Sequence, residues 1–260
     1  MDKFQLKTDT DIQTMTEGGA KLALVRDALA SFVKAGMTTM DIEKEAMRLI
    51  KEQGGKASFA MVPGYKYATC VNVNDEVVHA VPNERVIKPG DIVGIDVGIF
   101  YKGFHTDTAV TVLVPNKNSK VDPKVEKFLE VGRMGLKKAI LEAKPGKRIA
   151  DISKAMQTAV ENAGYSVVQA LTGHGVGRNL HEEPAIPCFV LGSYENSPKI
   201  VPGMVLAIEI MYNMGESDVM YKNSDGWTIN TADGTISGLF EETVAVTKDG
   251  PIVLTQAKKR

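Results

Sequence analysis

The chain has 260 residues, and its 31 Lys and Arg nearly balance its 32 Asp and Glu, giving a formal net charge of −1. This balance excludes a net electrostatic attraction to nucleic acid or to an anionic membrane as the basis of function. The hydrophobic fraction of 43% and the charged fraction of 24% are typical of globular proteins, so they exclude the disordered and fibrous classes.

Apolar residues recur every three to four positions in four segments, which predicts four helices. Gly36, Gly54 and Gly164 mark the ends of three of them, and Asp122 followed by Pro123 marks the start of another. The predicted helices span about residues 11–35, 40–53, 122–144 and 150–163. Runs of β-branched residues predict strands at residues 67–73, 91–100, 104–114, 204–211 and 241–247.

Two cysteines lie far apart in the sequence and cannot form a disulfide framework. The first ten residues are too polar for a signal peptide, and no apolar run approaches the roughly 20 residues that cross a bilayer. We therefore expect a cytoplasmic protein that does not contact a membrane.

An internal repeat relates the two parts of the chain. The pattern of Gly36, Asp41, Ile42 and Gly54 recurs 110 positions later, and the pattern of Pro89, Gly90, Ile92, Ile95 and Asp96 recurs 113 positions later, where Glu209 replaces Asp96. We expect one domain, residues 1–260, built from two similar halves at about residues 11–114 and 122–250. If these halves pack about a pseudo-twofold axis, Asp96 and Glu209 approach each other near that axis.

Four acids fall within apolar strand patterns. The segment 91–114 reads as a hairpin with its turn at residues 101–102 or 102–103, and either turn puts Asp96 and Asp107 on one face of neighbouring strands. Glu209 and Glu241 lie in two further apolar strands, and no Lys or Arg lies within these strand cores. Buried like charges require raised pKa values, a shared proton or a bound cation. Four such acids together favour a metal centre over four separate structural roles.

Two of the four histidines lie near one glycine-rich loop. His174 stands between glycines in the stretch 173–177, where small neighbours let an imidazole approach a site closely, and His181 follows seven residues later. Carboxylates with one imidazole suit manganese, iron(II), cobalt or zinc, and shared carboxylates can bridge two ions. These residues predict a dinuclear metallohydrolase, and a phosphoesterase would use similar ligands. His105 has no assigned role.

At these residues the sequence resembles the type I methionine aminopeptidases, over residues 10–254. The matching segments are GDIVGIDV (90–97), GFHTDT (103–108), GHGVGRNLHEEP (173–184), PGMVLAIE (202–209) and FEET (240–243). The resemblance implies an α+β pita-bread fold with two pseudo-symmetric helix–strand halves around a central antiparallel sheet.

The resemblance also implies a set of site residues. Two divalent metal ions, cobalt, manganese, iron or zinc, would be bound by Asp96, Asp107, His174, Glu209 and Glu241, of which Asp107 and Glu241 bridge. Glu209 would help to activate the bridging water, and His79 and His181 would contact the substrate amide and stabilise the tetrahedral intermediate. Tyr65, Cys70 and Trp227 would complete substrate binding. The repeat would pair Asp107 with Glu242 rather than Glu241, but alternation along the strand puts Glu241 on the small, polar face.

The implied activity is hydrolysis of an N-terminal methionine from peptides and nascent proteins with a small second residue. Phe59, Val62 and Leu180 depart from the usual pattern of the methionine pocket, so the preferred N-terminal residue stays open. A proline-directed (Xaa-Pro) aminopeptidase and a non-catalytic binding homologue are the alternatives. We expect a monomer without a nucleic-acid site, and the ribosome is a candidate partner.

Overall fold

The computed structural model describes residues 4–116 and 121–257, and it contains all four predicted helices. Thr8 and Thr38 each cap a helix through a reciprocal bond with the aspartate three residues later, which explains where two of the helices begin. The side chain of Asp122 caps the third helix as predicted. The helices are α1 (Asp9–Phe32), α2 (Thr39–Glu52), α3 (Pro123–Glu142) and α4 (Ile149–Glu161), with short 3-10 helices at Phe59–Met61 and Tyr194–Asn196.

The five predicted strands are present, and eight further strands accompany them among the described residues. The predicted ones are β2 (Thr69–Val73), β4 (Ile92–Tyr101), β5 (Phe104–Leu113), β9 (Val205–Asn213) and β12 (Ser237–Thr247), the last beginning four residues earlier than expected. The others are β1 (Lys56–Ala57), β3 (Glu76–Val78), β6 (Ser166–Val167), β7 (Thr172–Gly175), β8 (Glu182–Pro187), β10 (Val219–Tyr221), β11 (Ile229–Thr231) and β13 (Gly250–Val253).

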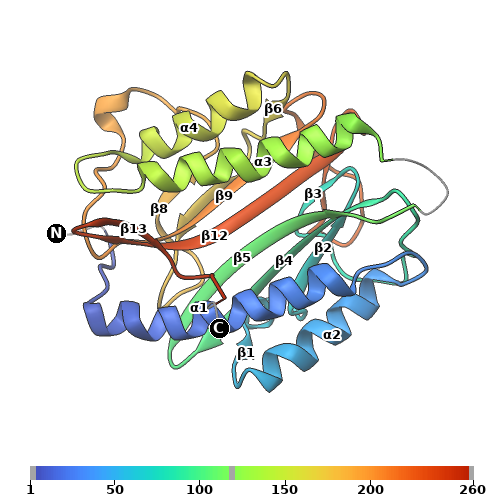
Figure 1. Ribbon diagram of the computed structural model, residues 1–260, viewed down its shortest axis with the longest axis horizontal. Coiled ribbons are helices and arrows are strands. Elements are labelled where there is room, and N and C mark those ends of the chain that lie inside the picture. Colours follow the sequence, from blue (N-terminus) through green and yellow to red (C-terminus); the bar gives the residue numbers. More distant parts are fainter. Residues whose placement is uncertain (1–3, 117–120, 258–260) are drawn as a thin grey trace.

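One large antiparallel sheet organises the molecule, with the strand order β1-β4-β5-β12-β9-β7-β8. Strands β2, β6 and β13 extend it, and β10, β11 and β3 form a small separate sheet. Helices α1 and α2 lie over the half that contains β4 and β5, while α3 and α4 lie over the half that contains β9 and β12 (Figure 1). The expected α+β architecture with two helix–strand halves around an antiparallel sheet is confirmed.

Strand register shows the pseudo-symmetry directly. Strand β1 pairs with β4 at Lys56 and Phe100, and β6 pairs with β9 at Ser166 and Asn213, which are the same two positions displaced by 110 and 113. Isolated bridges join Thr38 to Val86 in one half and Arg148 to Lys199 in the other, with the same displacements. The two halves therefore repeat their pairing as well as their sequence pattern.

Two apolar cores fill the space between the sheet and the helices. In the first half, Ile95 and Val97 of β4 pack with Leu22 and Val25 of α1. In the second half, residues of β9 and β12 pack with α3 and α4. Because side chains alternate along a strand, the residues between these core positions, Asp96 among them, point to the opposite face of the sheet.

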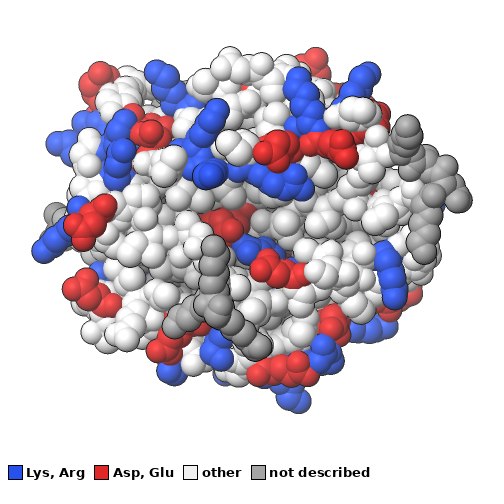
Figure 2. Space-filling view, viewed as in Figure 1, with Lys and Arg blue, Asp and Glu red and all other residues white. Residues whose placement is uncertain are grey.

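The helix-covered face of the molecule carries charges of both signs, which are interspersed over the surface (Figure 2). None of the helices among residues 4–116 and 121–257 combines the length and the apolarity needed to cross a lipid bilayer.

Candidate metal centre

Three acids and an alanine form one row across the four central strands. Asp96 of β4 pairs with Ala109 of β5, Ala109 pairs with Glu241 of β12, and Glu241 pairs with Glu209 of β9. Neighbouring strands lie about 4.8 Å apart, so acids on one face of this row reach a common space. Asp107 lies two residues before Ala109 and therefore on the same face.

The hairpin turn decides how Asp96 and Asp107 are related. Tyr101 pairs with Phe104, so the turn is Lys102–Gly103, the second of the two expected alternatives. Both turn residues have positive φ, 47° and 90°, as a type I′ turn requires. Asp107 consequently faces Gly98, and the two aspartates are diagonal neighbours.

The two halves of the sheet meet where β5 and β12 pair at the acid row. Beyond the two paired positions of these strands, Asp107 donates its N–H to the Thr243 hydroxyl (2.9 Å), and that hydroxyl donates to the Asp107 carbonyl (2.7 Å). The Thr108 hydroxyl donates to the Glu241 carbonyl (2.8 Å). These bonds fix the backbones of Asp107 and Glu241 relative to each other.

His174 enters the site from β7, beside Ala207 of β9. Its Nδ1 lies 2.8 Å from the Gly175 carbonyl oxygen, so Nδ1 carries the proton and Nε2 keeps a free lone pair. A Cβ on Gly173 would lie 2.6 Å from the Ala207 carbonyl oxygen, and one on Gly175 would collide with Glu183. The glycines thus allow the backbone of β7 to approach its neighbouring strands closely.

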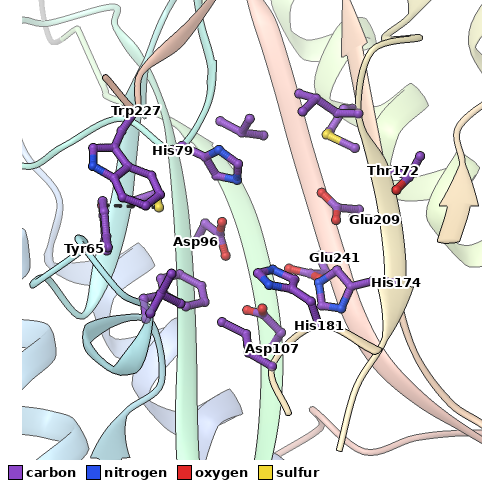
Figure 3. A pocket seen from close by; sticks show the side chains of 17 residues that line it. Tyr65, His79, Asp96, Asp107, Thr172, His174, His181, Glu209, Trp227 and Glu241 are labelled. Carbon is purple, nitrogen blue, oxygen red and sulfur yellow. Dashed lines mark hydrogen bonds between the residues drawn. The ribbon is translucent and has the colours of Figure 1, made fainter. Parts of the chain in front are cut away.

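A cavity of about 340 Å³ contains these side chains. In Figure 3, Asp96 and Asp107 point from one side toward Glu209, Glu241, His174 and His181 on the other. Ligand atoms of Asp107, His174 and Glu241 lie within 4.8 Å of one another, while Asp96 and Glu209 line the same cavity outside this closest group. The complete lining is Phe59, Val62, Tyr65, Cys70, Val78, His79, Asp96, Asp107, Leu171, Thr172, His174, Leu180, His181, Glu209, Met211, Trp227 and Glu241.

Burial and mutual repulsion disfavour the charged forms of the four carboxyl groups. Burial raises the pKa of Asp96 to about 7. Burial, followed by the charge of a neighbouring aspartate, raises the pKa values of Asp107, Glu209 and Glu241 well above their usual range. Burial lowers the pKa of His174 to about 4, so this imidazole is neutral at pH 7.

The donor set fits divalent cations. No Lys or Arg is among the described residues that line the cavity, and Asp96 Oδ1 is buried without a hydrogen-bond partner. An orphaned carboxylate oxygen, three further acids and an available imidazole Nε2 are the ligand types that manganese, iron(II), cobalt and zinc share. A bound cation would also offset the repulsion among the acids.

The other predicted site residues also line this cavity. Tyr65 and Trp227 stack edge to face with ring centroids 5.0 Å apart, and the Tyr65 hydroxyl donates to the Thr69 carbonyl (2.7 Å). Cys70 is buried beside Tyr65. In Figure 3, Tyr65 and Trp227 form the wall opposite His174, and His79 lies between that wall and the acids.

The two remaining histidines of the cavity differ in exposure. His79 is half-buried and has a positive φ of 57°, and burial lowers its pKa. His181 is exposed, and its ring lies 4.5 Å from that of His174 in an edge-on contact.

Glu242 points away from the cavity. Its carboxylate accepts a hydrogen bond from Arg26 of α1 (2.8 Å) and another from Thr255. Glu241 and not Glu242 therefore lies among the acids, as alternation along the strand indicates.

Sequence reasoning did not single out Val78, Leu171, Thr172 and Met211, which also line the cavity. Alternation along the strand could have identified Met211, because it lies two residues after Glu209 and therefore on the same face.

His105, for which the sequence gave no role, is buried outside the cavity. Its Nδ1 bonds to the Ser58 hydroxyl, and its backbone N–H donates to the Gly177 carbonyl (2.7 Å).

A sheet of two matched halves, with acids and an imidazole gathered at their junction, defines a metal-dependent hydrolase of the pita-bread class. Comparison with known proteins agrees: metallopeptidase family M24 matches residues 13–248. The chain belongs to this family.

Relatives of known name are similar over nearly the whole chain. Methionine aminopeptidase 1 of Bacillus subtilis is 42% identical over 250 residues, which cover 96% of this chain and 98% of that protein. The crystal structure of methionine aminopeptidase from Thermotoga maritima has a TM-score of 0.92 at 38% identity and covers 97% of this chain and 99% of that one. The resemblance to the methionine aminopeptidases is thus confirmed.

More distant structures share the fold alone. Prolidase from Pyrococcus furiosus has a TM-score of 0.76 at 21% identity, with 98% of this chain and 66% of that chain covered.

Proposed function

We propose that this protein is a methionine aminopeptidase, which hydrolyses the first peptide bond of chains that begin with methionine and continue with a small residue. The observation that carries the proposal is the division of one cavity into two parts. Acids and His174 occupy one part, and an apolar pocket of Phe59, Tyr65, Leu180 and Trp227 adjoins it. A pocket of this kind accepts one apolar side chain while the attached carbonyl lies beside the acids.

Five side chains would hold two divalent cations: Asp96, Asp107, His174, Glu209 and Glu241, with Asp107 and Glu241 shared between them. Such cations supply a nucleophilic water at neutral pH and polarise the scissile carbonyl. The closeness of Asp107, His174 and Glu241 supports this assignment, as does the unpartnered oxygen of Asp96.

Glu209 would accept the proton of the attacking water and return a proton to the amine that leaves when the C–N bond breaks. His181 and His79, which both line the cavity, would donate hydrogen bonds to the substrate amide and to the oxygen that gains charge. Tyr65, Cys70 and Trp227 would line the pocket for the first side chain.

The substrate class would be peptide and nascent-chain N-termini, and because nascent chains begin with methionine where they are synthesised, we place the enzyme in the cytoplasm. Association with the ribosome and a monomeric state stay predictions.

The test uses tripeptides and protein loaded with manganese, iron(II), cobalt or zinc. We expect cleavage of Met–Ala–Ser, slow cleavage of Ala–Ala–Ser and none of Ala–Pro–Ser, with two metal ions per chain by elemental analysis. Equal rates on the first two peptides would refute methionine preference, and cleavage of Ala–Pro–Ser alone would favour the proline-directed alternative. No cleavage of any peptide would favour the non-catalytic binding homologue.

Glu241→Gln and Glu242→Gln form a matched pair for the ligand assignment. We expect the first to lose metal and activity and the second to keep both, since Glu242 faces Arg26 on the other side of the sheet.

A further inference from the structure

Lys7 and Glu182 form a buried ion pair outside the cavity. Their side chains are only 5% and 1% exposed, and the pair joins the segment before α1 to the start of β8. The second oxygen of Glu182 accepts the backbone N–H of Asn179 (3.0 Å). One oxygen of the Glu182 carboxylate therefore contacts the Lys7 ammonium, and the other fixes the backbone at Asn179.

The segment between Asn179 and Glu182 contains two residues of the cavity. Leu180 and His181 lie between Asn179 and Glu182, and both line the cavity. At the other end of the loop, Gly177 donates its N–H to the Asn179 carbonyl (3.0 Å). In the described structure, the loop 177–182 is thus fixed at its base by the carboxylate of Glu182 and by its own turn, while His181 itself is exposed.

Lys7 is itself firmly placed. Its backbone N–H donates to the Gly203 carbonyl (2.7 Å), and the next residue, Thr8, caps α1. A Cβ on Gly177 would lie 2.7 Å from the Lys7 ammonium nitrogen, so the end of this side chain packs directly against the glycine. A second, exposed contact joins the same two segments, between Arg178 and Asp11 (3.3 Å).

We infer that Lys7 is a positioning residue for His181: through Glu182 it fixes the loop 177–182 so that the imidazole meets the substrate amide. This inference rests on the proposed function for the role of His181. Removing the ammonium would leave a buried carboxylate without its partner, and the loop would move to bring Glu182 toward water. The apolar stem of methionine in place of Lys7 isolates this effect from packing.

The experiment compares Lys7→Met, His181→Ala and the double variant of both, with Lys102→Met as the matched control. Lys102, in the turn between β4 and β5, forms an exposed ion pair with Glu17 of helix α1, so removing its charge leaves no buried carboxylate unpaired. We expect Lys7→Met to lower kcat for Met–Ala–Ser at least tenfold at unchanged metal content, and Lys102→Met to stay within twofold of the parent. Because Lys7 acts through His181, adding Lys7→Met to His181→Ala should change kcat by less than twofold. If the loss of kcat in the double variant equals the product of the losses in the two single variants, the inference is overturned.

Hydrogen exchange of the backbone gives a readout that does not need activity. We expect the amides of residues 177–182 to exchange at least tenfold faster in Lys7→Met and to be unchanged in Lys102→Met. Unchanged exchange in Lys7→Met overturns the positioning role whatever the activity, whereas an inactive parent with faster exchange in Lys7→Met overturns the proposed function alone.

A double variant, Lys7→Met with Glu182→Gln, serves if Lys7→Met alone does not fold. It removes both charges of the pair and so buries no unpaired charge. We expect it to fold, with kcat about threefold below the parent and exchange of the loop still raised. If both kcat and the exchange rate of the loop amides in this variant equal those of the parent, the ion pair is dispensable for positioning, and the inference is wrong.

Discussion

Removing divalent cations should make the stability of the protein fall as pH rises. The carboxyl groups of Asp96, Asp107, Glu209 and Glu241 have raised pKa values in the folded chain, chiefly because they are buried. In the metal-free protein these groups keep protons that the unfolded chain has released. Their stabilising contribution is therefore complete below about pH 4, the unfolded value, and is lost as pH rises through the folded value.

The size of the effect follows from Asp96. A rise of its pKa from the ordinary 3.8 to about 7 corresponds to about 4 kcal/mol of unfolding free energy, lost between roughly pH 4 and pH 7. The other three acids add to the loss in the same direction. Burial lowers the pKa of His174 and of His105 to about 4, so these imidazoles oppose the loss below about pH 6.5, and the net fall in stability is clearest above neutral pH. Bound cations should reverse the dependence, because they bind the deprotonated carboxylates and so stabilise the folded state most at the higher pH.

The assay is urea unfolding of the chelator-treated protein at pH 5, 6, 7 and 8, with and without manganese. Asp96→Asn should flatten the dependence on pH, and Asp249→Asn, at an exposed site, should not. A metal-free protein whose stability is constant or increases from pH 7 to pH 8 would refute the reasoning, as would an Asp96→Asn variant with the parental slope.

Three further predictions concern the site and the core. Asp107→Asn and His174→Ala should each lower kcat/KM for Met–Ala–Ser at least a thousandfold and reduce bound metal in elemental analysis, and a fully active variant of either kind would contradict the ligand assignment. His181→Ala should lower kcat at least tenfold while metal content stays at the parental value, since this side chain serves the substrate, and metal-free His181→Ala protein would overturn that role. Phe128→Ala should lower the free energy of unfolding, measured in urea, by about 3–5 kcal/mol, because Phe128 is fully buried and stacks on Tyr212 with ring centroids 4.3 Å apart. The kcat of the folded protein should not change. A loss below about 1 kcal/mol would show that this core does not depend on the stacked pair.

Local signals made the long elements predictable. Helix α2 begins where Thr38 and Asp41 can bond reciprocally, and strand β4 is a long β-branched run, so both follow from neighbouring residues. Strand β6 does not: it has two residues, Ser166 and Val167, and exists because β9 lies beside it. Two residues are too few to show an alternation of apolar and polar side chains, so pairing with β9 determines the conformation of β6.

The same distinction separates the parts of the site. Alternation along one strand distinguishes Glu241 from Glu242, and the structure places only Glu241 in the cavity. The partnership of Lys7 and Glu182 spans 175 positions, and a single lysine in a polar N-terminal segment has no pattern that indicates burial. Such a pair emerges only when the fold brings the two segments together.

Register also identifies which residues of the two halves correspond. Asn72 of β2 pairs with Gly94 of β4, and His174 of β7 pairs with Ala207 of β9. Gly94 and Ala207 differ by 113 positions, the displacement that relates Asp96 to Glu209. Asn72 and His174 are therefore equivalent positions in the two halves.

The histidines follow the same symmetry. His79 comes seven residues after Asn72, as His181 comes seven residues after His174, and both line the cavity. The halves thus contribute one matched pair of acids, Asp96 and Glu209, and one matched pair of outer histidines, but they differ at the position of Asn72 and His174. There Asn72 accepts the N–H of Ala80 (3.0 Å) and fixes the chain next to His79, whereas His174 leaves its Nε2 for a ligand. Because only one half carries an imidazole at this position, the proposed cations would have unlike ligand sets, and the two halves of the site would present different groups to the substrate.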